Sequence, residues 1–370
     1  MPSLRTDTLS LGTLALVVVS WGCSPDESPT GPSTALQPSI TTAATYTIRD
    51  LGTLGGPFAS AYGINNAGVV VGSSSLGEYP DTRVHAFVWK NGVMKDLGTI
   101  VGGSESHANA INNDGFIVGY SLNGTGDTRA VRWTPDGRKR SLGTLGGRNS
   151  EARGINDFGV IVGWSETLSG QRHAFRWENG VMTDLGTMGG TSSEAYDINR
   201  GGAVVGASRI ASGKLHAFKW KAGVFKDLGV TTAGGGWEAK YSVATAINTK
   251  GQIAGITGPP LDAEGEEVDI TRGFVFYQDR LTGCCRIFRP TTEVNDINTN
   301  GIVVGMEWDG RSPEVNYQVA WVHEGGTTTQ LPGLSDEPSE ALGINLAGNI
   351  VGYSRLGPFG PTHAVLWRRQ

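Results

Sequence analysis

Three of the six histidines of this chain recur at one spacing from an aspartate. His85, His173 and His216 each precede an Asp by eleven residues. Imidazole serves as a general base or a metal ligand. An active-site base is rarely needed several times in one chain, so we predict structural hydrogen bonds between adjacent strands instead. The pairs are His85 with Asp96, His173 with Asp184 and His216 with Asp227; His363 occupies the same place in its segment.

Carboxylates also recur, four residues before the Ile of a repeated Ile-Asn motif. They are Glu151, Glu194, Glu293 and Glu340. If the strand that carries them is the innermost of its unit, they lie near one mouth of a central channel, where a cation could bind. The alternative is that each Glu accepts hydrogen bonds from the next unit.

Aromatic residues gather beside the same motif. Tyr120, Trp164 and Tyr353 follow its second Gly, and Trp237 and Trp308 lie in nearby loops. Sugar rings could stack on these five side chains, or the side chains pack locally. The repeated Trp of the segments that open with His, as at Trp89 and Trp177, is expected to pack between units.

Two further groups could do chemistry. The segment from Asp262 to Asp269 holds five acidic residues in eight, which is compatible with calcium, but its spacing differs from the EF-hand pattern and an ordinary solvated loop explains it. Cys284 and Cys285 are adjacent, and they form either a vicinal disulfide or buried thiols. The sequence assigns no cofactor and no catalytic residue.

The motif Ile-Asn-x-x-Gly-x-x-x-Gly sets the architecture. Seven copies follow one another at intervals of 43 to 50 residues. The copies begin at Ile64, Ile111, Ile155, Ile198, Ile247, Ile297 and Ile344. A regular period of this length is typical of solenoids and propellers.

One unit contains four short strands. In the first unit we predict strands from Ala61 to Asn65, Val69 to Ser73, His85 to Lys90 and Val93 to Leu97. Asn and Gly make the tight turn after the first strand, and Asn91-Gly92 makes the last hairpin. Seven such units of antiparallel strands predict an all-β, seven-bladed β-propeller.

The chain ends predict how the ring closes. The last unit stops at its third strand, His363 to Trp367, and Tyr46 to Gly52 is a fourth strand without a first three. Pairing the N-terminal strand with the last blade completes it and removes two exposed edges. An open β-solenoid is the alternative, but it needs caps rather than complementary half-units.

Composition agrees with repeated turns. The chain has 56 Gly in 370 residues, about twice the usual share. A net charge of −5 without a long run of either sign disfavours nucleic acid as a partner. Three Cys are too few for a disulfide scaffold of this length.

The N-terminus predicts export. Residues 1–22 have an apolar run before a small residue, as in a secretory signal peptide, and residues 23–44 are a tether rich in Pro, Ser and Thr. Ser20 to Cys23 resembles a lipobox, in which Cys23 is lipidated, although Ser20 and Trp21 depart from the pattern. Plain secretion and a buried strand are the alternatives. The third domain, residues 45–370, is the propeller.

The segments HAFxW, DLGTLGG (Asp50 to Gly56) and INNxG (Ile64 to Gly68) resemble the HAF-repeat family of probable extracellular bacterial proteins. The resemblance covers Tyr46 to Gln370, and it is weakest in the fifth and sixth units, where CCRIFRP replaces DLGTLGG. It implies export and a repeat fold, but no activity.

We therefore expect an exported scaffold, either secreted or lipid-anchored at the bacterial outer membrane or cell surface, that binds a protein or polysaccharide through variable loops on one propeller face. We expect it to be monomeric and to meet the membrane only through its anchor. The alternatives are an exported hydrolase or lyase acting on glycans, and a purely structural envelope protein.

Overall fold

The computed structural model describes residues 44–78, 81, 83–230, 239–258, 272–276, 285–287, 292–309 and 317–370, with residues 285–287 and 309 in backbone only. The predicted signal peptide and tether, the lipidation site Cys23, Trp237, Cys284 and the acidic segment 262–269 lie outside these residues. Among the described residues, no helix is long and apolar enough to cross a membrane.

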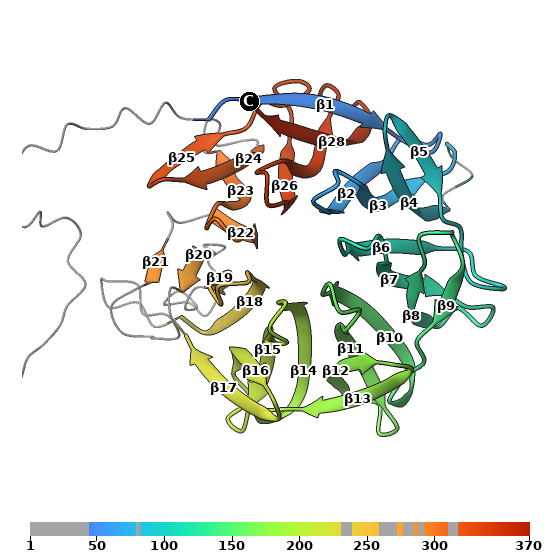
Figure 1. Ribbon diagram of the computed structural model, residues 1–370, viewed down its shortest axis with the longest axis vertical. Helices are drawn as coiled ribbons and strands as arrows, with labels where there is room; N and C mark the ends of the chain where they lie inside the picture. The colour runs from blue at the N-terminus through green and yellow to red at the C-terminus, as the bar shows by residue number, and fades with distance from the viewer. Residues whose placement is uncertain are drawn as a thin grey trace, which may run out of the picture. The chain divides into compact units, whose positions relative to one another are not determined.

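Seven four-stranded antiparallel sheets form a ring, with the first strand of each sheet, strand A, innermost and strand D outermost (Figure 1). The first four blades are β2 (Ala59–Ile64), β3 (Val70–Ser75), β4 (Val84–Lys90) and β5 (Val93–Asp96); β6 (Ser106–Ile111), β7 (Ile117–Leu122), β8 (Thr128–Trp133) and β9 (Lys139–Ser141); β10 (Gly146–Ile155), β11 (Ile161–Thr167), β12 (Arg172–Glu178) and β13 (Val181–Gly186); β14 (Gly189–Ile198), β15 (Val204–Ile210), β16 (Leu215–Lys221) and β17 (Val224–Gly229).

The remaining blades follow the same order from strand A to strand D. They are β18 (Tyr241–Ile247), β19 (Ile253–Gly258), β20 (Arg272–Phe276) and β21 (Cys285–Ile287); β22 (Thr292–Ile297), β23 (Val303–Asp309), β24 (Tyr317–Glu324) and β25 (Thr327–Gln330); β26 (Ser339–Ile344), β27 (Ile350–Arg355), β28 (Thr362–Arg369) and β1 (Tyr46–Gly52). The predicted seven-bladed propeller is confirmed.

The ring closes within the seventh blade, as predicted. Strand β1 pairs antiparallel with β28, and the sheet order is β1-β28-β27-β26. His363 of β28 bonds Asp50 of β1 at 2.8 Å, which joins the two ends of the chain. An open solenoid is therefore wrong, since both edges that it would leave exposed are paired with each other.

Local sequence explains the first turn of each blade. The side-chain Oδ1 of Asn65 accepts the backbone N–H groups of Ala67 and Val69, and Gly68 adopts a φ of 74°. Gly is the residue that takes this left-handed conformation without strain. Strand β2 therefore ends at Ile64, one residue before the predicted end, because Asn65 is used in the turn.

The second Gly of the motif is required by a close approach of strands A and B. A Cβ placed on Gly163 would lie 1.9 Å from the backbone oxygen of Glu151. The register of β10 and β11 shifts between Ala152 and Gly154, which marks a bulge beside this contact. The second Gly of each motif thus marks the position where strands A and B approach each other most closely.

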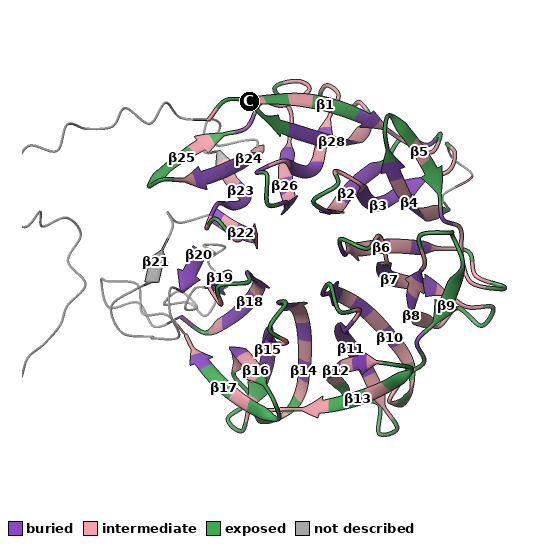
Figure 2. Ribbon diagram, viewed as in Figure 1, coloured by how far each residue is buried: buried purple, intermediate pink, exposed green. Residues whose placement is uncertain are grey.

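The core lies between neighbouring blades. One cluster joins Val118 and Leu142 of blade two to Ile155, Phe175 and Trp177 of blade three. Figure 2 shows buried residues in strands A to C and exposed residues along outer strands such as β9. The prediction that the repeated Trp packs between blades is confirmed, because Trp177 is buried in this cluster.

Consecutive turns alternate between the two faces of an antiparallel blade. We call the face with the A to B turns and the C to D hairpins the turn face; Asn65 to Gly68 and Asn179-Gly180 lie on it. We call the opposite face the loop face; it carries the D to A and B to C connections, such as residues 97–105 and 168–171.

Candidate functional site

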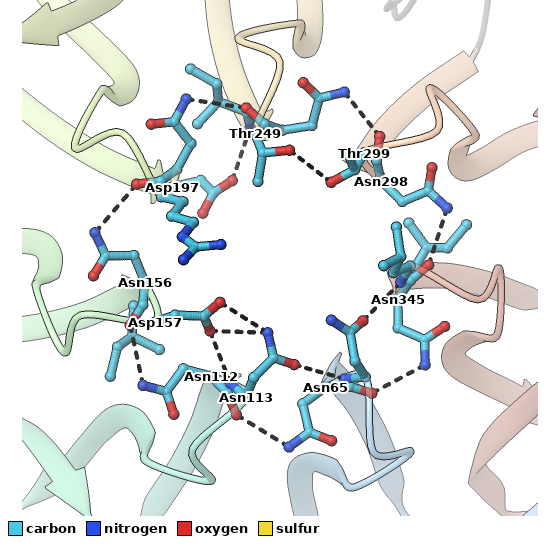
Figure 3. A pocket seen from close by; sticks show the side chains of 18 of the residues that line it. Asn65, Asn112, Asn113, Asn156, Asp157, Asp197, Thr249, Asn298, Thr299 and Asn345 are labelled. Atoms are coloured by element: carbon cyan, nitrogen blue, oxygen red, sulfur yellow. Dashed lines mark hydrogen bonds between the residues drawn. The ribbon is translucent and has the colours of Figure 1, made fainter.

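Seven equivalent asparagines link all blades around the channel at the turn face (Figure 3). Each donates from Nδ2 to the backbone oxygen of the motif Asn in the next blade, at 2.9 to 3.3 Å. The series runs Asn65, Asn112, Asn156, Asn199, Asn248, Asn298, Asn345 and back to Asn65. We call this series the asparagine ring. Sequence reasoning assigned these residues to turns only and missed the ring.

The asparagine ring surrounds a cavity of about 440 Å³ that all seven blades line. The residue after each motif Asn forms a second, irregular layer around it. Asn113 donates to Asp157 at 3.0 Å, and the Thr249 and Thr299 hydroxyls bond each other at 3.0 Å. Polar groups therefore surround the cavity, but the Nδ2 groups of the asparagine ring already donate to the backbone of the next blade.

The predicted carboxylates lie on the wall of the channel toward the loop face. Glu151 accepts hydrogen bonds from Asn109 of the preceding blade at 3.1 Å and from the Trp164 indole at 2.9 Å. It also pairs with Arg153 at 3.2 Å. Blade two, blade three and the Trp of strand B are thus joined at one carboxylate.

Glu194 occupies the equivalent position one blade further on, where arginines take the place of the Asn and Trp donors. Arg153 and Arg172 contact it at 2.8 and 3.3 Å. The guanidinium of Arg153 also lies over the ring of Tyr196, 4.4 Å from its centroid. Burial acts to lower the pKa of Arg153, but the charges of Glu151, Tyr196 and Glu194 together raise it above its ordinary value.

The other two predicted carboxylates also have partners. Glu340 accepts a hydrogen bond from Asn295 of blade six at 2.9 Å, and burial raises the pKa of Glu340. Glu293 is half-buried at the equivalent position of blade six and also interacts with its surroundings. Glu151, Glu194 and Glu340 therefore accept bonds from the preceding blade, and the expected donor in the next blade is wrong. Cation binding by these carboxylates stays a prediction.

The predicted aromatic residues that the structure describes lie in the B strands of four different blades. Tyr120 stacks on His107, with ring centroids 4.6 Å apart, and burial lowers the pKa of His107 to about 4. Trp164 is only 5% exposed, and Arg172 lies 4.1 Å above its ring. Tyr353 donates to Gln318 at 3.0 Å. Trp308 is half-buried within strand β23, so its predicted place in a loop is wrong. Stacking of sugars on these residues stays a prediction.

The predicted His to Asp hydrogen bonds are confirmed. The Nδ1 to carboxylate distances are 2.9 Å for His85 and Asp96, 2.8 Å for His173 and Asp184, and 3.0 Å for His216 and Asp227. Each Asp also accepts the backbone N–H of the Gly two residues later. These pairs fix the end of strand D to strand C, so His and Asp here act as a structural clasp.

Two acidic residues of the channel wall were missed. Asp197 and Asp296 each accept the backbone N–H of the Ile that follows them and the N–H of a motif Ile in the next blade. Burial, and then the charge of Asp197, raise the pKa of Asp296 to about 7. Equivalent positions hold Gly or Ala in the other blades, and no periodic signal marked them.

The part of the chain that the structure describes contains no group of three or more His, Cys, Asp or Glu side chains arranged to hold a metal ion. The arrangement of the channel wall instead joins neighbouring blades through charged and amide side chains. Bonds of this kind, made at the same place in most blades, hold the ring together.

No protein-family model matches the chain, and no curated protein is similar to it. Solved structures are similar in fold. The propeller domain of the Trilobed protease from Pyrococcus furiosus is 9% identical and matches 85% of this chain and 97% of that chain, with a TM-score of 0.54. The uncomplexed acylaminoacyl peptidase from Pyrococcus horikoshii is 11% identical, with a TM-score of 0.50. The match covers 87% of this chain and 53% of that chain.

TolB from Acinetobacter baumannii is 16% identical, with a TM-score of 0.49, and the match covers 77% of this chain and 66% of that chain. The chain thus spans just under two thirds of TolB and about half of the peptidase. At these identities the similarity establishes the fold alone. The chain is a seven-bladed β-propeller whose blades are linked by hydrogen bonds at the channel.

Proposed function

We propose that the protein is an exported binding scaffold, anchored through a lipid on Cys23, that binds a protein or polysaccharide on its loop face. The resemblance of its HAFxW and DLGTLGG segments to HAF repeats supports export, as does the apolar run before Cys23. A propeller serves this role because a rigid ring carries variable connections.

The proposal rests on one contrast: the bonds that hold the blades together recur around the ring, whereas the loop-face connections between strands B and C differ in length. The asparagine ring recurs in every blade, and the clasp between His and Asp in four. The B to C connections differ instead: eight residues separate β3 from β4, four separate β11 from β12, and thirteen separate β19 from β20. The chain varies where a ligand can be contacted without disturbing the ring.

Thermal stability of the full chain in detergent, measured with fragments of envelope and plant polysaccharides, tests the binding function. A ligand at about 100 times its dissociation constant adds about 2.7 kcal/mol of stability. We expect Val101→Asp or Leu168→Asp, at residues 98% and 88% exposed on the loop face, to abolish this stabilisation. Val181→Asp, at an exposed residue beside a turn-face hairpin, is the matched control.

Equal loss in the Val181→Asp control would place binding elsewhere and contradict the proposal. Release of new sugar ends from any polysaccharide would favour the glycan-active enzyme instead.

The anchor is tested separately: Cys23→Ala should move the protein from the membrane fraction to the soluble fraction. Retention of that variant in membranes would exclude lipid at Cys23.

A further inference from the structure

A groove of about 420 Å³ lies on the turn face between blades two and three. It is lined by the A to B turns of both blades, by strands C and D of blade two and by a hairpin of blade three. Arg132 and Arg140 line it, together with Phe116, Phe158 and Trp177. The groove is on the face opposite the variable loops.

Arg132 is half-buried in this groove, and it has no hydrogen-bond partner among the residues that the structure describes. Its Nε is buried and unbonded. The guanidinium lies over the rings of Phe116 and Trp177, with its Cζ 5.1 and 5.3 Å from their centroids. Stacking occupies the faces of a guanidinium and leaves the N–H groups in its plane available to an acceptor. Burial, and then the charge of Arg140, lower the pKa of Arg132.

Arg140 increases the concentration of positive charge. It is directly opposite Arg132 in the register of β8 and β9. Like charges at directly opposite positions of a strand pair are destabilising. Among the described residues neither arginine has a carboxylate partner, whereas Arg176, at the equivalent position of blade three, pairs with Glu178 at 2.8 Å. Two neighbouring arginines without an ion-pair partner can bind an external anion through their N–H groups.

Three carboxylates also line the groove, and among the described residues none of them forms an ion pair with Arg132 or Arg140. Asp157 is bonded to Asn113, and Glu178 is bonded to Arg176. Asp114 is exposed on the rim. The groove also presents an apolar surface, because Phe158 is 68% exposed, with Arg200 5.6 Å from its centroid. Bidentate donors beside an exposed aromatic ring suit a ligand with an oxyanion and an apolar face.

We propose that this groove binds an acidic sugar, a pyranose ring that carries a carboxylate or sulfate. Arg132 and Arg140 bind the anionic group, and Phe158 packs against the ring face of the sugar. The volume of the groove suits one or two sugar residues. This site goes beyond the proposed loop-face function, and it does not depend on that function.

Direct titration of the full chain in detergent tests the site with four probes: an oligogalacturonate, a sulfated disaccharide, a neutral oligosaccharide of the same length and polyglutamate. We expect an acidic sugar to bind and the neutral one not to bind. Arg132→Gln and Arg140→Gln should each raise Kd by about tenfold or more, since a hydrogen bond to a charged group is lost. If only one of the two acidic sugars binds, its anionic group, carboxylate or sulfate, is the one that the groove recognises.

Arg138→Gln is the matched control, because it removes the same charge from blade two but its side chain pairs with Asp136. We expect it to leave Kd within about twofold. Arg140 is exposed, so its variant should fold normally and, without ligand, melt no lower than the native chain. Phe158→Ala should weaken binding of the sugar and leave binding of inorganic sulfate unchanged.

Three results would overturn the proposal. The first is that neither acidic sugar binds at millimolar concentration. The second is that polyglutamate or inorganic sulfate binds as tightly as the sugars, which would make the groove a general anion site. The third is that Arg138→Gln weakens binding as much as Arg140→Gln. The Val101→Asp variant should bind the acidic sugar as tightly as the native chain does, and loss of that binding would place the acidic-sugar site on the loop face instead.

Discussion

Asp296 shows how one residue of the channel wall adds a pH dependence to the whole fold. Its carboxylate accepts backbone N–H groups of Ile297 and Ile344 at 2.7 and 2.9 Å. Burial, and then Asp197, raise its pKa to about 7. An acid with a raised pKa in the folded state is deprotonated first in the unfolded chain. Its contribution to the free energy of unfolding therefore falls as pH rises from about 4 to about 7.

Replacement of Asp296 by Ala should remove this dependence. Blades two and five carry Ala110 and Ala246 at the same position, so the frame accommodates Ala there. We expect the free energy of unfolding of Asp296→Ala to rise relative to the native chain by a few kcal/mol between pH 4 and pH 7, at about 1.4 kcal/mol per pKa unit.

Denaturant unfolding at several pH values measures this change. Asp336→Ala, at an exposed residue, is the control, and its curve should stay parallel to that of the native chain. Parallel curves for Asp296→Ala as well would show that this carboxyl group is not the source of the pH dependence.

Strand β1 is the element on which closure depends. It supplies the outer strand of blade seven, buries Leu51 and holds His363 through Asp50. Without it, β28 exposes an unpaired edge at the surface of the ring.

Deletion of Tyr46 to Gly52 should therefore lower the melting temperature by about 10 °C or more. The estimate takes a loss of about 5 kcal/mol, from cross-strand hydrogen bonds and side-chain pairs of about 1 kcal/mol each, at about 2 °C per kcal/mol. Calorimetry measures the shift, and addition of the peptide YTIRDLG should restore part of it. A melting temperature that hardly changes would mean that closure contributes little.

The asparagine ring acts at the scale of the whole molecule, because each of its bonds joins two blades and the last returns to the first. Asn199 is 8% exposed, its Oδ1 accepts the N–H of Ala203, and its Nδ2 donates to Asn248. An Asp at this position would keep the acceptor for the turn but lose the donor to the next blade.

Asn199→Asp should lower the free energy of unfolding by about 1 to 3 kcal/mol, as expected when a buried acceptor loses its donor. Chemical denaturation measures it. Asn179→Asp is the matched control, because Asn179 lies in an exposed hairpin and should change stability by less than about 0.5 kcal/mol. An equal effect of both variants would show that the ring bond contributes nothing beyond the turn.

Much of this architecture could be predicted from the sequence. The Ile-Asn motif and the HAFxW segments predicted four strands, seven blades and closure through Tyr46 to Gly52. The spacing of His85 from Asp96 predicted the clasp. These features depend on hydrogen bonds inside one repeat or on the order of the repeats. Both can be predicted because the residues that determine them recur at a regular spacing in the sequence.

Tertiary structure alone decided what each repeat contacts in its neighbour. Asn65 and Asn112 are 47 residues apart, and Asn345 reaches Asn65 across 280. Phe116 and Trp177 enclose Arg132 from two different blades. A periodic sequence shows which positions are equivalent but not which positions face each other between units. Those contacts form only when seven blades close around one axis, because closure sets the distance and angle between neighbouring blades.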